Sequence, residues 1–339
     1  MSERLCRIAF DGMGGDDAPS VTVAGAVAAV RDDKGIEIHI TGIEEKLREE
    51  LSKHEYDRDR IIVVPASEVI ETAEPPVVAV HNKKDSSLVK ALYMVKRGEC
   101  DAYLSAGSTG ATLVGGQIIV GRIAGVERPA LAPVIPTEKG VSVLIDCGAN
   151  VDARASQLVQ FARMGSAYSE NVLGVKDPTV ALVNIGAEEE KGNSLVKETY
   201  PLLKECRDIN FIGNIEARDI SAGAADVIVC EAFTGNVILK MYEGVASTFY
   251  RLLKSALMKN TVSKLGALIV KPYIKDGIKD FTMSKYGAAP LLGCRGLVMK
   301  THGSCDVTEV RNSLIQCREF VESGITERFE KLFGDKSED

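Results

Sequence analysis

Lys191 lies in a polar segment between a strand-like run and a helix-like run. The segment reads Asn184-Ile-Gly-Ala-Glu-Glu-Glu-Lys191-Gly-Asn193. A cation close to a helix N-terminus opposes the positive end of the helix dipole, so a negative group should lie nearby. That group is either Glu188, Glu189 or Glu190, in a weak exposed ion pair, or an anionic substrate or developing oxyanion that the lysine meets.

Two other turns carry groups that can contact an oxygen anion. Asn236 follows Thr234-Gly235 at a predicted strand-to-helix turn, where its amide can donate a hydrogen bond to a substrate oxygen. Ordinary helix capping is the alternative. Gly107-Ser-Thr-Gly110 stands at the start of a predicted helix, whose free N–H groups attract a small anion. There the alternative is that Ser108 or Thr109 simply caps the helix.

Other catalytic chemistries find little support. The sequence contains no dinucleotide-binding glycine motif, no P-loop and no G-x-S-x-G elbow. Its eight cysteines form no C-x-x-C motif, and they are expected to be reduced and mostly buried. Cys147, Cys230 and Cys305 lie at or near strand ends and are weak nucleophile candidates.

A metal site is not predicted. With four histidines and no tight Cys or His spacing, no structural zinc site is proposed. Asp11, Asp146 and Asp152 would hold a divalent ion only if they converge. His302 is either a polar residue of the site or a core histidine.

The elements that must position these residues follow an α/β pattern. Short apolar runs alternate with longer helical stretches, which predicts parallel strands joined by helices and covered on both faces. The predicted strands are 7–11, 36–41, 61–64, 101–105, 141–146, 179–185, 210–215 and 226–231. The predicted helices are 19–31, 86–97, 109–120, 155–173, 194–206, 234–257, 262–270 and 304–331. In such sheets ligands bind beyond the carboxyl ends of the strands, which is where the polar turns fall.

Composition limits the class of protein. The 339 residues carry a net charge of −7, which argues against a nucleic-acid partner. Residues 102–121 contain no charge, but their glycines and hydroxyl side chains favour a buried strand, turn and helix over a membrane span. With no leader-like segment, we expect a cytoplasmic protein. The length predicts one catalytic domain over 1–333, with two lobes around a cleft as an option, and a frayed tail over 334–339.

One segment has an unusual charge. Residues 244–275 contain no acidic residue, within a chain of −7. Helical apolar stripes accompany the charges, so the segment is basic and amphipathic. Such helices lie on anionic membranes or bind acidic proteins, and a solvated basic face over an ordinary core is the alternative. Its basic residues are Arg251, Lys254, Lys259, Lys264, Lys271 and Lys275.

Taken together, these turns resemble the bacterial phosphate acyltransferase PlsX family, which makes acyl phosphate from acyl-acyl-carrier-protein. The matching blocks run in order along nearly the whole chain. They are FDGMGGDDAP, LSAGSTGA, DCGANVD, QFARMG, NIGAEEEKGNSLVKETY, NFIGNIEARDI, FTGNVILK and APLLGCRGLVMKTHGS. The resemblance implies a Rossmann-like α/β/α sandwich of the isocitrate-dehydrogenase and phosphate-acetyltransferase type, with additional helices in the C-terminal half, and a homodimer.

The resemblance also implies roles for individual residues. Lys191 and Asn236 match the family's proposed catalytic pair, with Lys191 neutralising charge and Asn236 positioning the substrate or donating to the oxyanion. Substrate or phosphate binding is expected from Gly107, Ser108, Thr109, Gly110, Asp11, Asn184 and His302. Contact with membrane or carrier protein is expected from Arg251, Lys254, Lys259, Lys264 and Lys271. Neither a metal nor a cofactor is expected.

The expected reaction is direct attack of inorganic phosphate on the thioester, which feeds phospholipid synthesis. Phosphate is already an anionic nucleophile, and a thiol of pKa about 8.5 is a tolerable leaving group. The expected partners are acyl carrier protein, an anionic membrane surface and a downstream membrane glycerol-3-phosphate acyltransferase, so the protein would be peripherally membrane-associated. A short-chain phosphotransacetylase using coenzyme A and a catalytically silent scaffold for carrier protein are the alternatives.

Overall fold

The computed structural model describes residues 4–277 and 287–334, with the side chains of 274–277 left aside. The chain divides into two compact units. The first unit comprises the described residues of 1–133, 163–177 and 284–339, and the second those of 134–162 and 178–283. Each unit has its own sheet. Residues 335–339 of the predicted tail and the side chain of Lys275 lie outside the described part of the chain.

The first unit contains a seven-stranded sheet. Five neighbouring strands are parallel, in the order β3 (Ile61–Pro65), β2 (Ile36–Gly42), β1 (Cys6–Asp11), β4 (Ala102–Ser105) and β12 (Leu297–Thr301). Antiparallel β11 (Ala288–Leu292) and β5 (Ala130–Leu131) complete it. The parallel strands are apolar on both faces because helices cover both. Ile8, Phe10, Tyr103 and Leu104 are accordingly fully buried.

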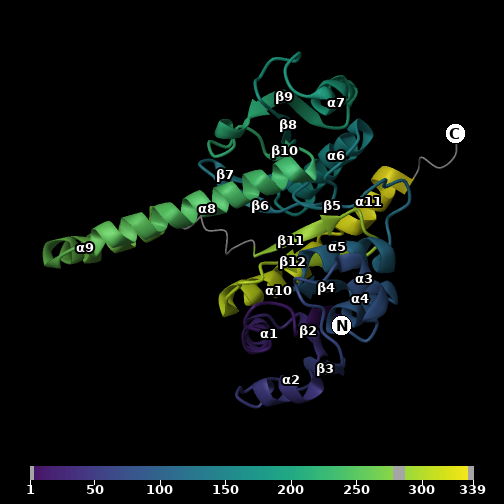
Figure 1. Cartoon of the computed structure of the whole chain (residues 1–339), viewed down its shortest axis with the longest axis vertical. Helices are drawn as coiled ribbons and strands as arrows, with labels where there is room; N and C mark the ends of the chain where they lie inside the picture. The colour runs from purple at the N-terminus through teal and green to yellow at the C-terminus, as the bar shows by residue number, and fades with distance from the viewer. Residues whose placement is uncertain (1–3, 278–286, 335–339) are drawn as a thin grey trace. The chain divides into compact units, whose positions relative to one another are not determined.

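Helices cover both faces of this sheet. Figure 1 shows α1 and α10 on one side of it and α4 and α5 on the other. A π-helical turn, η1 (Gly116–Val120), continues α5. The helices of this unit are α1 (Ser20–Asp32), α2 (Glu44–Leu51), α3 (Pro76–Asn82), α4 (Ser87–Lys96), α5 (Thr109–Gly115), α10 (Val307–Glu322), α11 (Ile325–Gly334) and the second half of α6 (Ala155–Asn171).

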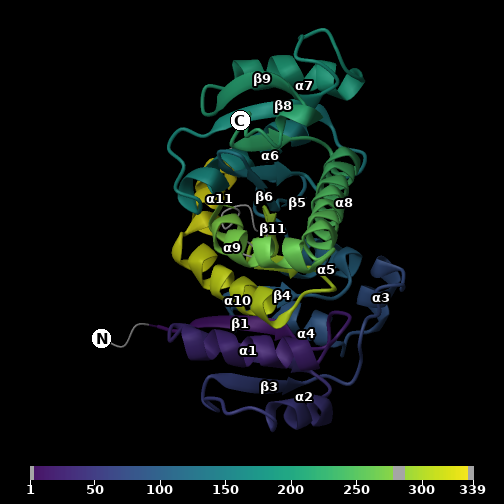
Figure 2. The same cartoon turned by 90° about the vertical axis from the view of Figure 1, so that its left-hand side faces the viewer.

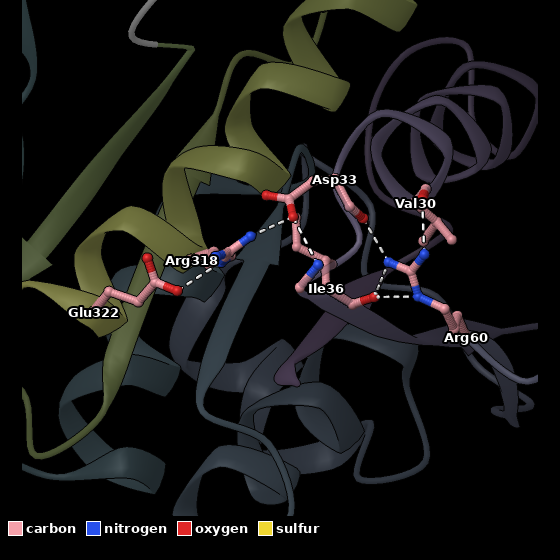
Figure 3. A network of polar contacts seen from close by, with 7 residues as sticks. Val30, Asp33, Ile36, Arg60, Arg318 and Glu322 are labelled. Atoms are coloured by element: carbon pink, nitrogen blue, oxygen red, sulfur yellow. Dashed lines mark hydrogen bonds and ion pairs between the residues drawn. The ribbon is translucent and has the colours of Figure 1, made fainter. Parts of the chain in front are cut away.

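Two arginines tie the helices to the amino ends of the strands (Figure 3). The buried Arg60 donates to the carbonyl oxygens of Val30 (2.9 Å), Asp33 (2.5 Å) and Ile36 (2.6 and 3.0 Å), and so satisfies carbonyls at the end of α1. Arg318 of α10 pairs with Asp33 and, at 2.6 Å, with Glu322. This network holds the amino ends of the strands, which lie opposite the polar turns at the carboxyl ends.

The second unit contains a five-stranded sheet of the order β6 (Val134–Thr137), β7 (Gly140–Ile145), β10 (Val227–Val229), β8 (Thr179–Asn184) and β9 (Asn210–Glu216). All neighbours are parallel except β6 and β7. Helix α7 (Ser194–Glu205) packs on β8 and β9 (Figure 2), and α8 (Ala232–Leu257) packs on β7. The short helix η2 (Ala217–Asp219) follows β9, and α9 (Thr261–Gly277) follows α8.

The predicted elements are present with small shifts, but three features differ. The single helix predicted over 304–331 is wrong, because α10 ends at Glu322 and Gly324, at φ +62°, separates it from α11. Helix α8 begins at Ala232, two residues before the predicted start. The short elements that the sequence did not predict are α2, α3, η2, β5, β6, β11 and β12.

Candidate active site

The second unit collects polar turns at the carboxyl ends of three parallel strands. Strands β7, β10 and β8 are neighbours, and Asp146, Glu231 and Asn184 lie at or just beyond their ends. Lys191 follows β8, and Asn236 lies beyond β10 near the start of α8. The structure therefore brings Asn184, Lys191 and Asn236 to one edge of one sheet, which is where open parallel sheets bind ligands.

Asn184 organises the turn that carries Lys191. Its side chain is 8% exposed, its Nδ2 donates to the Lys191 carbonyl at 3.0 Å, and its Oδ1 accepts from Ile185 N at 2.8 Å. The turn is fixed further by Asn214, whose Nδ2 donates to the Glu188 carbonyl at 3.1 Å. Buried amides that satisfy backbone groups in this way hold a loop in one conformation. Asn184 thus acts on the position of the Lys191 backbone.

Lys191 itself has an exposed ammonium paired with a carboxylate. Its Nζ lies 2.9 Å from Glu188, and the two side chains are 48% and 52% exposed. The hydrogen bond that Lys191 donates to Glu188 raises the pKa of Lys191, so the side chain is a cation at neutral pH. Exposed pairs of this kind are weak. An incoming anion can therefore take the place of Glu188 as the partner of Lys191.

The start of α8 differs from the predicted turn. Glu231 is the N-cap, and its carboxylate accepts from the backbone of Phe233 (2.5 Å) and Thr234 (3.1 Å). Asn236 consequently lies inside the helix, and the capping alternative for it is wrong. Its side chain is partly buried, and within the described part of the chain the amide makes no hydrogen bond. An amide in this state is available to a ligand oxygen.

The first unit gathers its own polar turns at the ends of β1, β4 and β12. Asp11, Ser105 and Lys300 lie side by side in register across these strands. Asp11 is 2% exposed and accepts from Ser105 Oγ (2.8 Å) and Met13 N (3.3 Å), while Ser105 Oγ accepts from Gly107 N (2.9 Å). Burial raises the pKa of Asp11. In this arrangement Asp11 holds the turn that leads to Gly107.

The turn at Gly107 packs tightly against the turn after β1. A Cβ on Gly14 would lie only 2.6 Å from Gly107 N, so a side chain there has no room. Ser108 is the N-cap of α5, since its Oγ accepts from Ala111 N at 3.3 Å. The capping interpretation of Ser108 is therefore confirmed. Thr109 is exposed, and so is His302, which follows β12.

Sequence reasoning missed Lys300. This lysine is 8% exposed at the end of β12, and its Nζ donates to the carbonyl of Thr301. Burial lowers its pKa to about 8, although the negative Asp11 and Asp16 partly oppose that shift. The available signal was a charge inside the apolar run Leu297-Val-Met-Lys300. A buried lysine at the carboxyl edge of a parallel sheet is an unusual, costly placement.

Comparison with known proteins places these turns in a family. The model of the family described as "Fatty acid synthesis protein" matches residues 6–328. A phosphate acyltransferase of Clostridium perfringens (strain SM101 / Type A) is 52% identical over 333 residues, which are 98% of either chain. One of Clostridium novyi (strain NT) is 49% identical and covers 95% of this chain and 97% of its own. The chain belongs to this family of phosphate acyltransferases.

Two solved structures of other proteins have a fold similar to that of this chain. A phosphotransacetylase from Streptococcus pyogenes matches with a TM-score of 0.60 at 16% identity, covering 95% of both chains. A branched-chain phosphotransacylase from Enterococcus faecalis V583 matches with a TM-score of 0.55 at 14% identity, covering 94% of this chain and 99% of its own. The predicted Rossmann-like α/β class and the resemblance to the PlsX family are confirmed, and the chain is an acyltransferase.

The cysteines of this phosphate acyltransferase are poorly suited to nucleophilic catalysis. Burial raises the pKa values of Cys147 and Cys230 well above 9 and that of Cys305 to about 11. These thiols are therefore protonated at neutral pH, whereas the thiolate is the nucleophilic form. Cys317 in α10 is fully buried, which agrees with the expectation that the cysteines are mostly buried.

The basic residues of α8 and α9 are exposed. Among the described residues, no carboxylate forms an ion pair with Arg251, Lys254, Lys259, Lys264 or Lys271, and Arg251 instead bonds Thr248 Oγ1 at 3.2 Å. Apolar side chains of the same two helices are exposed as well, among them Phe249 (68%), Leu252 (65%) and Leu268 (69%). Figure 1 shows α8 extending away from the sheet of its own unit, with α9 at its far end.

Over residues 4–277 and 287–334, no group of three or more His, Cys, Asp or Glu side chains is arranged to hold a metal ion. Over the same residues, no helix combines the length and apolar composition that crossing a bilayer requires.

Proposed function

We propose that this acyltransferase moves a long acyl chain from the thioester of acyl carrier protein to inorganic phosphate, and that the acyl phosphate feeds phospholipid synthesis. The relatives named phosphate acyltransferase and the family description support this reaction. The observation that carries the proposal is that the exposed cation of Lys191 and the amide of Asn236, which bonds no described residue, follow neighbouring strands of one sheet.

In the proposed reaction a phosphate oxygen attacks the thioester carbon directly. A C–O bond forms, the carbonyl oxygen becomes an oxyanion, and its collapse breaks the C–S bond and releases the thiolate of the carrier. Lys191 neutralises the phosphate charge, which offsets part of the cost of removing phosphate from water. Asn236 donates to the oxyanion, whose charge exists only near the transition state. The protonated cysteines support a route without a protein nucleophile.

Further substrate contacts remain predictions. Gly107, Ser108, Thr109, Gly110 and His302 are proposed to contact substrate or phosphate. Asp11 and Asn184 are proposed to act in binding through the turns that they hold, because both side chains are buried and bonded to their own turns.

A phosphate-dependent assay tests the proposed function. The enzyme is given acyl thioesters of carrier protein or of coenzyme A, and acyl phosphate is trapped with hydroxylamine. We expect hydroxamate from the carrier-protein donor only when phosphate is present. Hydroxamate from coenzyme A donors alone would indicate a short-chain phosphotransacetylase. Binding of carrier protein without loss of thioester would indicate the scaffold instead.

We also propose a cytoplasmic enzyme that attaches peripherally to the membrane. The exposed basic residues of α8 and α9 would attract the anionic bilayer, where a glycerol-3-phosphate acyltransferase would consume the acyl phosphate, and would also suit an acidic carrier protein. The exposed apolar stripe of α8, which includes Met241, Val245 and Phe249, supports the homodimer expected from the family resemblance.

Vesicle binding is expected to depend on charge. Each basic residue near an anionic surface contributes roughly 1 kcal/mol, so changing Lys254, Lys259 and Lys264 together to serine should weaken binding to anionic vesicles by about 10². Added salt should weaken binding of the unmodified enzyme in the same direction. Cosedimentation with vesicles measures both effects.

The control removes the same charge elsewhere. Lys34, Lys46 and Lys84 are exposed in the first unit, and their joint change to serine should leave vesicle binding nearly unchanged. Equal binding of all three proteins, or equal binding to neutral and anionic vesicles at any salt concentration, would contradict the electrostatic attachment.

A further inference from the structure

Asp146 is a fully buried carboxylate that folds its own loop. It follows β7 and is 0% exposed. It accepts hydrogen bonds from the backbone N–H groups of Gly148 (3.2 Å), Ala149 (3.1 Å) and Asn150 (2.8 Å), and from Asn150 Nδ2 (2.8 Å). Several donors converging on one buried carboxylate lock a loop firmly, because losing the acceptor would leave them unsatisfied.

The loop 146–150, which Asp146 holds in place, contacts the first turn of α8. Asn150 O accepts from Ala232 N, the first residue of the helix, at 3.0 Å. Asp146 N donates to Cys230 O at 2.9 Å, which ties the loop to the end of β10. A Cβ on Gly235 would lie 1.9 Å from Asp146 O, so the helix backbone rests directly on the loop.

Asn236 is the residue after this contact. On the inner side of α8, Ile238 and Leu239 pack on the hydrophobic core of the second unit. The first turn of the helix is thus held between the core and the Asp146 loop. The side chain of Asn236 makes no hydrogen bond to any described residue, so its amide depends on this backbone contact for its position.

We propose that Asp146 is a positioning residue for the acyl transfer, which sets the place of the Asn236 amide through the loop 146–150 and the Gly235 contact. The inference rests on the proposed function, because it assigns Asn236 to the oxyanion. Oxyanion donors act only at a fixed distance from the developing charge, and small displacements of a reacting group cost large factors in rate.

Asp146→Asn tests the proposal with little change in volume. The amide places an NH2 group against backbone donors, so the loop loses part of its anchor. We expect kcat to fall by about 10-fold to 10², with little change in the KM for phosphate, because the oxyanion is absent from the ground state. Combining Asp146→Asn with Asn236→Ala should lower kcat no further than Asn236→Ala alone.

Asp226→Asn is the matched control. Asp226 directly precedes β10, at the amino ends of the strands of the same sheet. Its carboxylate accepts from Thr179 N (2.8 Å) and Thr179 Oγ1 (2.7 Å). The same substitution there should lower Tm and leave kcat within about twofold of the unmodified enzyme, because those strand ends are remote from Asn236. A loss of kcat equal to that of Asp146→Asn would show that general destabilisation explains both.

A milder variant covers the case in which Asp146→Asn does not fold. Asn150→Ala keeps the carboxylate of Asp146 and removes the 2.8 Å bond that Asn150 Nδ2 donates to it, so kcat should fall several-fold and the loss should again vanish in the Asn236→Ala background.

The outcomes distinguish a failure of the positioning role of Asp146 from a failure of the proposed site at Asn236. Undiminished kcat in Asp146→Asn, or losses that multiply with Asn236→Ala, would overturn the positioning role. Undiminished kcat in Asn236→Ala alone would instead overturn the proposed site.

Discussion

Asn236→Ala is expected to lower kcat by about 10² to 10³, as in other enzymes that lose one oxyanion donor. The amide lies near the start of α8 and is unbonded within the described residues, so its removal leaves no protein group unsatisfied. Stability should therefore change little. Steady-state assay of phosphate-dependent thioester loss, with thermal unfolding alongside, measures both quantities.

Two further substitutions sharpen this prediction. Asn236→Asp has nearly the same shape but places a carboxylate toward the oxyanion, so it should lose at least as much activity as the alanine variant. Asn82→Ala, at the exposed end of α3, should behave as the unmodified enzyme. An Asn236→Ala enzyme that is folded and retains near-normal kcat would contradict the role of the amide.

Lys191→Ala is expected to lower kcat/KM for phosphate by about 10² or more, because a developing or incoming anion loses its cationic partner. The loss should exceed that of Lys191→Arg, which retains the charge. Part of the effect would come from Glu188, since the substitution leaves its carboxylate without the 2.9 Å partner and next to the anion site.

A second change isolates that contribution. Lys191→Ala combined with Glu188→Gln should recover some phosphate affinity over Lys191→Ala alone. Lys197→Ala is the matched control, because Lys197 is exposed on the adjacent α7 and bonds no carboxylate of the described chain. Unchanged phosphate kinetics in Lys191→Ala would contradict the assignment of charge neutralisation.

The parallel strands could be predicted because their residues are apolar on both faces. Ile8, Ala9 and Phe10 point alternately to the two faces of the sheet, and all three are fully buried. Once strands and helices alternate, the polar turns must fall at the carboxyl edge, so the common location of Lys191 and Asn236 followed from order along the chain. The short antiparallel strands had no such signal, since β5 has two residues.

Local backbone geometry and burial could not be predicted. Gly324 breaks the C-terminal helix through a positive φ, although the apolar spacing continues beyond it. Glu231 caps α8 and thereby places Asn236 inside the helix, which the predicted strand 226–231 obscured. The sequence indicated for Asp146 only a conditional role as a metal ligand. Its role in the loop could not be predicted, because only the fold shows that backbone N–H groups of the loop surround its carboxylate.

The central claim is that phosphate itself cleaves the thioester, with no acylated enzyme. Exchange of labelled free carrier protein into acyl carrier protein, measured without phosphate, tests this claim most directly. Direct attack predicts no exchange until phosphate is added, because the C–S bond breaks only when phosphate attacks. Exchange in the absence of phosphate would reveal an acyl-enzyme intermediate and contradict the account.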